Sequence, residues 1–203
     1  MTPNDVDSQD PSPWAACAFA ACVATRWYAA AAAAWLSPSA PRFALGELWR
    51  WLEHGGDAPG FDVDTLMASL PLEDGGPLLA AIPGSVATVA VVRPLVEAAT
   101  LLAGSSRPRD VVEEAARSGE AAADELAYLE LRPPPPASLD EARGADEAQL
   151  AAPSAVAERN AQGEDLAVIS RGGQAGAVAA ALRAVNEARA RRIYERARAL
   201  GWP

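Results

Sequence analysis

The sequence predicts an all-α protein, an irregular bundle of six or seven helices, and three observations support this fold class. Alanine accounts for 49 of the 203 residues, and alanine has the highest intrinsic helix propensity. Four large apolar residues recur at i, i+3, i+4 and i+7, the spacing of one helix face: Leu45, Leu48, Trp49 and Leu52. The β-branched run at residues 86–92 could form a strand, but it has no second convincing strand to pair with.

Each expected helix lies between recognisable start and stop signals. Proline fits the first turn of a helix because its missing N–H is not needed there, as at Pro13 and Pro41. Asp62 or Asp64 can cap a short helix, and Gly104 can end the long apolar one. We therefore expect helices at about residues 13–36, 40–54, 62–70, 85–102, 110–131, 155–169 and 174–200, with residues 86–92 left open as a strand.

The first of these helices is apolar enough to raise the question of a membrane span. It is dominated by alanine, which is nearly neutral for insertion, and it carries Arg26 at its centre, which costs roughly 2.5 to 3.5 kcal/mol in a bilayer. We interpret it as a buried helix of a soluble protein. Cys17 and Cys22 are five residues apart and point to different sides, so we expect two small core residues in a reducing cytoplasm. Residues 1–10 carry three aspartates and no base, which predicts no export signal.

Four consecutive prolines divide the chain. Pro133 to Pro136 must be extended, and a polar, acidic stretch follows them. We expect a disordered tail at residues 1–12, a helical body at 13–132, a Pro-rich acidic linker at 133–153, and a C-terminal helical pair at 154–203 that packs on the body.

Composition excludes several classes of enzyme. The chain has no lysine, so a phosphate-binding loop with lysine, a Schiff-base lysine and a kinase lysine are absent. A single histidine and two cysteines leave too few residues for the usual metal sites and triads. We expect no cofactor, no metal and no catalytic residue. An enzyme that uses carboxylates in a helical pocket stays open as an alternative, because 27 acids are available.

Charge points instead to a protein partner. The formal net charge is −10, which disfavours nucleic acid and anionic membranes as partners. Residues 110–147 contain 11 acids and three arginines, and the apolar stripe expected on helix 110–131 leaves an acidic face. The stripe consists of Val112, Ala116, Gly119, Ala123 and Leu126, and the face of Glu113, Glu114, Glu120, Asp124 and Glu125. We expect this face to bind a basic protein, for example as an immunity or antitoxin protein occluding a basic toxin.

The last helix suggests a second kind of assembly. Its expected apolar stripe consists of Leu182, Val185, Ile193 and Leu200. At 100° per residue, Arg189 and Arg196 fall on the same stripe, and a buried arginine needs an acidic partner. We expect both to pair with the acidic helix, in the same chain or in a second copy. A structural or regulatory homo-oligomer is therefore the alternative to a foreign partner.

Short motifs give the chain a resemblance to a known family. They are Trp14-x4-Phe19-Ala20-x-Cys22-x3-Arg26, Leu48-Trp49-x-Trp51-Leu52-Glu53, Leu70-Pro71-x-Glu73-Asp74, and Glu158-Arg159-Asn160-Ala161-Gln162-x-Glu164-Asp165-Leu166. With them the chain resembles a divergent member of the helical bacterial family typified by the enterobacterial YjaG protein, over residues 14 to about 170. The resemblance implies an all-α cytoplasmic protein, and it carries over no catalytic residue.

Overall fold

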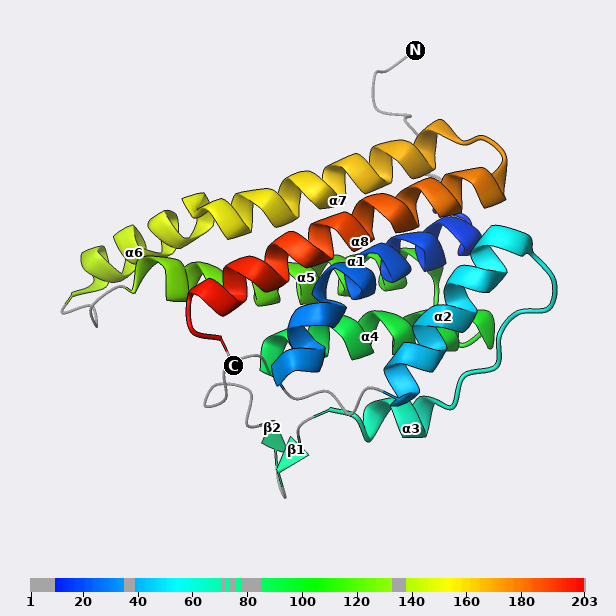
Figure 1. Ribbon diagram of the computed structural model, residues 1–203, viewed down its shortest axis with the longest axis horizontal. Coiled ribbons are helices and arrows are strands. Elements are labelled where there is room, and N and C mark those ends of the chain that lie inside the picture. Colours follow the sequence, from blue (N-terminus) through cyan, green and yellow to red (C-terminus); the bar gives the residue numbers. More distant parts are fainter. Residues whose placement is uncertain are drawn as a thin grey trace, which may run out of the picture.

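The computed structural model describes residues 10–34, 39–70, 72–73, 76–77, 85–132 and 138–202. This part of the chain is an all-α bundle, which confirms the predicted class, with eight helices where six or seven were expected (Figure 1). The elements are α1 Pro13–Ala34, α2 Ser39–His54, α3 Val63–Met67, β1 Leu72–Glu73, β2 Gly76–Pro77, α4 Ser85–Leu102, α5 Pro108–Leu131, α6 Leu139–Ala151, α7 Pro153–Arg171 and α8 Ala175–Ala199. The two short strands pair with each other in antiparallel fashion.

Helix α1 is the centre of the bundle. Residues 16–24 have no exposed surface, and α2, α4, α5, α7 and α8 all pack against α1. In Figure 1, α8 and α7 run along one side of α1 while α4 and α5 lie behind it. By length and composition α1 and α4 could cross a membrane, but 78% and 67% of their most apolar windows are buried inside the protein. Here both helices form the core.

Most of the expected helix boundaries agree with the structure. Asp62 is the cap of α3, and its carboxylate accepts hydrogen bonds from the backbone N–H groups of Asp64 and Thr65. Residues 86–92 are helical within α4, so the strand alternative was wrong. Gly104 follows α4 with a φ of +76°, a conformation that glycine adopts without strain. All four residues of the predicted face of α2 are buried.

The expected linker at residues 133–153 is wrong over most of its length, because α6 occupies residues 139–151. Ser138 caps this helix, and its hydroxyl accepts a hydrogen bond from the backbone N–H of Glu141 at 3.2 Å. A serine followed three residues later by a glutamate is a capping-box signal. Two of the acids that indicated a linker, Asp140 and Glu141, lie in the first turn of α6, where negative charge is favourable. Residues 133–137, like residues 1–9 of the expected tail, lie outside the described residues.

The two predicted apolar stripes match the buried faces only in part. On α5, Gly119, Ala123 and Leu126 are buried as predicted, whereas Val112 and Ala116 are half-buried. The buried face of α5 also includes Val111, Ala115, Ser118 and Ala122. On α8, Val185 is 47% exposed, whereas the buried residues are Ala179, Leu182, Asn186, Ala190 and Ala197. Leu182 is buried as predicted, and Ile193 and Leu200 are partly buried against the core. Hydrophobicity alone missed the remainder of both faces, because Ser118 and Asn186 are polar residues that face the core.

The two cysteines are free and buried, as expected. Burial raises the pKa of Cys17 to about 12. Burial, together with the charge of Asp165, raises the pKa of Cys22 well above its usual range. Only the thiolate is an efficient nucleophile, so both thiols are inert in the folded chain.

We expect iodoacetamide at about pH 8 to leave both cysteines unmodified in the native protein and to modify both after unfolding in urea. Intact-mass spectrometry measures the number of added groups. Rapid addition of one group to the native protein would contradict the burial of these thiols.

Candidate functional site

The buried guanidinium of Arg26 is the centre of an ion network that joins three helices. Its Nε and Nη2 donate hydrogen bonds to the two carboxylate oxygens of Glu158, at 3.1 and 2.8 Å. Its Nη1 bonds to the carboxylate of Asp165 and donates to Oδ1 of Asn186 at 2.7 Å. All four side chains are at most 3% exposed. The network therefore connects α1 to α7 and α8 through charged groups that water does not reach.

A second arginine completes the charge balance. Arg189 on α8 donates a hydrogen bond to Oδ1 of Asp165 at 2.7 Å, and its other amino group bonds to Glu164 at the surface. Asn186 donates to the same Oδ1 at 3.2 Å, and Gln162 donates to Oε1 of Glu158 at 3.0 Å. Each buried carboxylate thus has an arginine and an amide as partners. Buried charges are tolerated only when they are paired and hydrogen-bonded in this way.

The protonation of Arg26 follows from these contacts. Burial by itself would lower its pKa, but the charge and hydrogen bonds of Glu158, with the charge of Asp165, raise it above the usual value. Arg26 stays charged at every pH at which the protein is folded. Helix α5 closes the network on its fourth side, where Gly119 leaves room: a Cβ there would lie 2.6 Å from Oε1 of Glu158.

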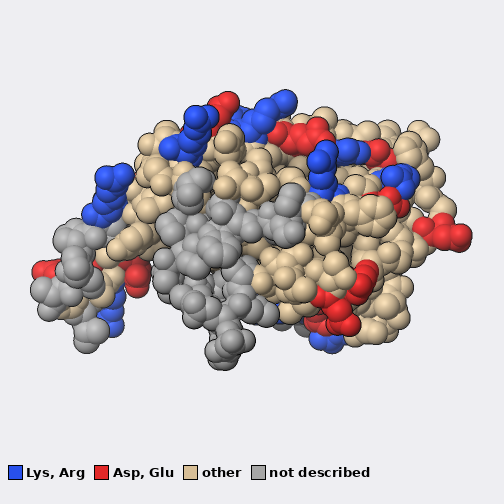
Figure 2. Space-filling model, turned by 60° about the horizontal axis from the view of Figure 1, so that its bottom comes forward, with Lys and Arg blue, Asp and Glu red and all other residues tan. Residues whose placement is uncertain are grey.

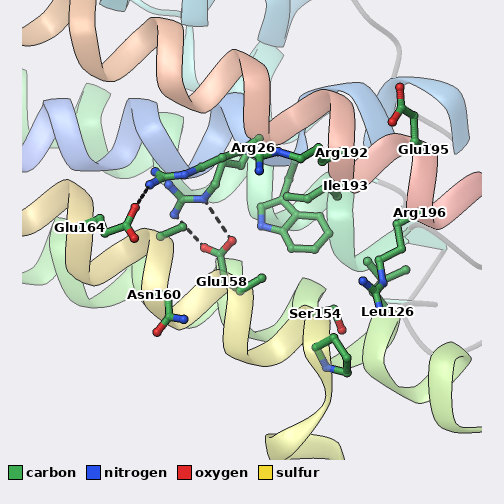
Figure 3. Close-up of a pocket in the computed structure, with 15 residues that line it drawn as sticks. Arg26, Leu126, Ser154, Glu158, Asn160, Glu164, Arg192, Ile193, Glu195 and Arg196 are labelled. Carbon is green, nitrogen blue, oxygen red and sulfur yellow. Dashed lines mark hydrogen bonds and ion pairs between the residues drawn. The ribbon is translucent and has the colours of Figure 1, made fainter.

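Beside the network, a groove runs between α7 and α8. We call it the α7–α8 groove, and its main pocket has a volume of about 640 Å³. Arg26 and Trp27 of α1 contribute to its lining, α7 and α8 form its sides, and Leu126 of α5 lies at one end (Figure 3). A second pocket of about 370 Å³ also lies between α7 and α8, and Arg189 and Glu164 line both pockets. Their ion pair therefore lies between the two pockets.

The two arginines predicted to form ion pairs do so within one chain. Arg189 pairs with Glu164 and Asp165 of α7, and not with the acidic helix. Arg196 pairs with Glu130 of α5, which belongs to the acidic helix.

The five acids predicted to form one face of α5 do not share one environment. Glu113 and Glu114 pair with Arg109 and Arg117 at 2.7 and 3.0 Å. Glu120 is exposed, while Asp124 and Glu125 are half-buried. The pKa of Asp124 is raised, because the effect of burial exceeds the opposing effect of the positive charge of Arg159. Four of the five predicted acids are thus paired with an arginine or half-buried, and Glu120 is the remaining exposed one.

Sequence reasoning missed the network, although signals for it were present. A lone arginine in an apolar, buried helix requires buried carboxylates elsewhere in the chain. Five residues of the family-like motifs are members of the network or its neighbours: Arg26, Glu158, Gln162, Glu164 and Asp165. The motifs therefore contain residues that hold the helices together.

The site consists of ion pairs and hydrogen bonds that join α1, α7 and α8. Within the described ranges, no group of three His, Cys, Asp or Glu side chains could hold a metal ion. The two carboxyls whose pKa burial raises, Glu97 and Asp124, do not line the α7–α8 groove. The carboxylates that do line it at the network, Glu158 and Glu164, are held by arginines.

Comparison with protein families, with curated proteins and with solved structures finds no match to this chain, so its resemblance to the YjaG-type family stays a prediction.

Proposed function

We propose that this chain is a non-enzymatic binding protein and that a basic protein docks on the C-terminal half of α5 together with α6. We call this region the acidic docking surface. It consists of the exposed acids Glu120, Asp140, Asp146 and Glu147, the half-buried Asp124, and the exposed apolar residues Tyr128 and Leu150.

The observation that carries the proposal is the combination of unpaired acids with exposed apolar side chains. In the described part of the chain, Glu120, Asp146 and Glu147 have no arginine within ion-pair distance. Tyr128 and Leu150 are each 54% exposed. The surface is mainly acidic, although Arg143 is exposed on α6 and the guanidinium of Arg159 donates a hydrogen bond to the backbone oxygen of Leu150. Exposed apolar side chains among mainly acidic residues are typical of a surface that binds a basic partner.

Helical geometry brings these residues together. Glu120, Asp124 and Tyr128 are four residues apart and so lie along one side of α5. The side chain of Gln149 on α6 donates a hydrogen bond to the backbone oxygen of Asp124 at 3.0 Å. This bond fixes the end of α6, with Leu150, against the same stretch of α5.

An immunity or antitoxin protein is the narrower form of this proposal, since such a protein needs only a surface that masks a basic toxin. Self-association is not proposed. Arg189 and Arg196, the residues that could have joined two copies, are paired within one chain. Figure 2 shows one face of the molecule, along the upper edge of which arginines and acidic residues are interspersed.

Charge reversal of Glu120→Arg with Glu147→Arg is expected to abolish partner binding. Both side chains are exposed, so the fold should not change. The matched control is Asp10→Arg with Asp57→Arg, which alters net charge equally at exposed positions outside the helices. Tagged proteins are passed through lysate of the source organism at about 0.05 M and about 0.5 M salt, and the bound proteins are identified and quantified.

The proposal predicts a stoichiometric basic protein that the wild type and the control retain at low salt, and that the reversed variant and high salt release. Equal capture by the reversed variant would contradict the assigned surface. Absence of any stoichiometric basic protein from all samples would contradict the proposed function.

A further inference from the structure

We propose that α6 is a detachable helix, which leaves the bundle and returns to it while the other helices stay folded, and that its docked position completes the acidic docking surface. Three observations support this: how little of α6 is buried, where its polar contacts lie, and how it is joined to α7. The effect on a partner rests on the proposed function, whereas the movement of α6 is a property of the free protein.

Helix α6 buries almost none of its own side chains. None of residues 140–151 is buried, whereas eight residues of α5 and six of α7 are. The half-buried residues of α6 are Ala142, Ala145 and Gln149, which are three and four residues apart and so form the side that meets the bundle. Two methyl groups and one amide remove little apolar area from water. Apolar packing therefore contributes little to the attachment of α6.

The sequence of α6 does not hold it helical by itself. The helix has 13 residues, and isolated helices of this length are marginal in water. Gly144 lies in its interior, where glycine weakens a helix relative to alanine. Once α6 leaves the bundle, little keeps it helical, so undocking and unfolding of α6 are one event.

Two polar contacts hold the C-terminal end of α6. The side-chain amide of Gln149 donates a hydrogen bond to the backbone oxygen of Asp124 on α5 at 3.0 Å, and Arg159 on α7 donates one to the backbone oxygen of Leu150. Figure 1 shows α6 at one end of the molecule, away from α2 and α3. Each of these contacts is a single hydrogen bond, and its net contribution to stability is modest because water replaces it on opening.

A hinge joins α6 to α7. Ala152 is the single residue between the two helices, and its φ of −61° and ψ of 147° are extended and not helical. Pro153 begins α7 and has no N–H with which to continue the hydrogen bonds of α6. Ala152 is buried with Ala127 and Ala155 in a small cluster of its own. This cluster anchors the hinge, so α6 can turn away from α5 without moving α7.

Movement of α6 divides the acidic docking surface. Asp146, Glu147 and Leu150 move with α6, whereas Glu120 and Tyr128 stay on α5. A partner that contacts both groups binds only the docked state, so its apparent affinity falls in proportion to the docked fraction. The partner in turn favours docking of α6 by the same coupling free energy.

Hydrogen exchange of the free protein, followed by mass spectrometry of its peptides, measures how often each helix opens. The backbone amides of α6 are expected to be protected at least about tenfold less than those of α5 and α7, because α6 opens without global unfolding. Gln149→Met keeps a long, unbranched side chain but removes its N–H donor. It should speed exchange in α6 about three- to tenfold and leave α5 and α7 unchanged.

Matched glycine variants test whether α6 opens independently of α7. Gly144 on α6 and Gly163 on α7 are both exposed, and a Cβ at either position meets nothing within 4 Å. Gly144→Ala should slow exchange in α6 about two- to fivefold, whereas Gly163→Ala should not affect α6. Gly144→Pro should remove the protection of α6 and leave α7 protected at least about a thousandfold. Gly163→Pro breaks a helix that belongs to the core, and it should remove the protection of both.

The inference is overturned if α6 and α7 are equally protected in the wild type, if Gly144→Ala and Gly163→Ala slow α6 equally, or if Gly144→Pro removes the protection of α7 as well. In the lysate experiment, Gly144→Pro should capture the basic protein as poorly as the reversed variant, and full capture would overturn the role of α6 in the surface. Absence of the basic protein from every sample contradicts the proposed function alone, because exchange in the free protein does not depend on a partner.

Discussion

Replacing Arg26 by methionine is expected to lower the free energy of unfolding by about 3 to 5 kcal/mol, because it leaves buried carboxylates without their cation. Glu158 and Asp165 are 3% and 1% exposed, so water cannot replace the guanidinium. Asp165 keeps Arg189 as a partner, whereas Glu158 keeps only the amide of Gln162. Urea denaturation followed by circular dichroism at pH 7 measures the loss.

A double variant tests whether the loss comes from the unpaired charge. Arg26→Met combined with Glu158→Met removes both members of the closest ion pair and replaces them with apolar side chains. Exchange of a buried ion pair for apolar residues is often neutral. We therefore expect the double variant to regain most of the stability that the single variant loses. A single-variant loss below about 1 kcal/mol would contradict the buried network, as would a double variant whose loss equals the sum of the two single losses.

Gly176→Ala is expected to destabilise the protein by about 1 to 3 kcal/mol, the usual cost of inserting a methyl group into a packed contact. Gly176 lies in the first turn of α8, and a Cβ there would come within 3.0 Å of the backbone oxygen of Glu53 at the end of α2. Backbone cannot rotate away as a side chain can, so α2 and α8 would have to separate. Thermal unfolding of the variant measures the effect.

Gly163→Ala on α7 is the matched control. A Cβ at this helical position meets nothing within 4 Å. Alanine stabilises a helix interior by about 0.5 to 1 kcal/mol relative to glycine. The two glycine-to-alanine substitutions should therefore change stability in opposite directions. A gain of stability in both variants would show that α2 and α8 do not approach each other closely.

The fold was predictable from sequence where one local signal dominated. The periodic apolar residues of α2 and the capping aspartate of α3 located both helices, because helix faces and caps are set by residues a few positions apart. Helix α6 was missed, because its polar and acidic composition is typical of a linker and the capping box of Ser138 and Glu141 was not recognised. The buried faces of α5 and α8 were predicted only in part, because polar residues occupy some of their positions.

The site was predictable in kind but not in detail. A buried arginine in an apolar helix needs carboxylate partners. The same rule predicted an acidic partner for Arg189, and it holds equally for Arg26. Nothing local indicates which of the 27 acids meet it. The partners of Arg26 are 132, 139 and 160 residues away in sequence. Only the packing of α7 and α8 against α1 brings them together, and periodicity within one helix contains no information on that packing.

The long separation between Arg26 and its partners has a consequence for synthesis of the chain. A ribosome makes α1 first, whereas Glu158, Asp165 and Asn186 emerge only with the last two helices. Before then, helices α2 to α5 cannot pack around α1 without enclosing the guanidinium of Arg26 in apolar surroundings with no carboxylate partner. The nascent N-terminal part should thus stay loosely associated and exposed to chaperones until α7 and α8 arrive to neutralise it.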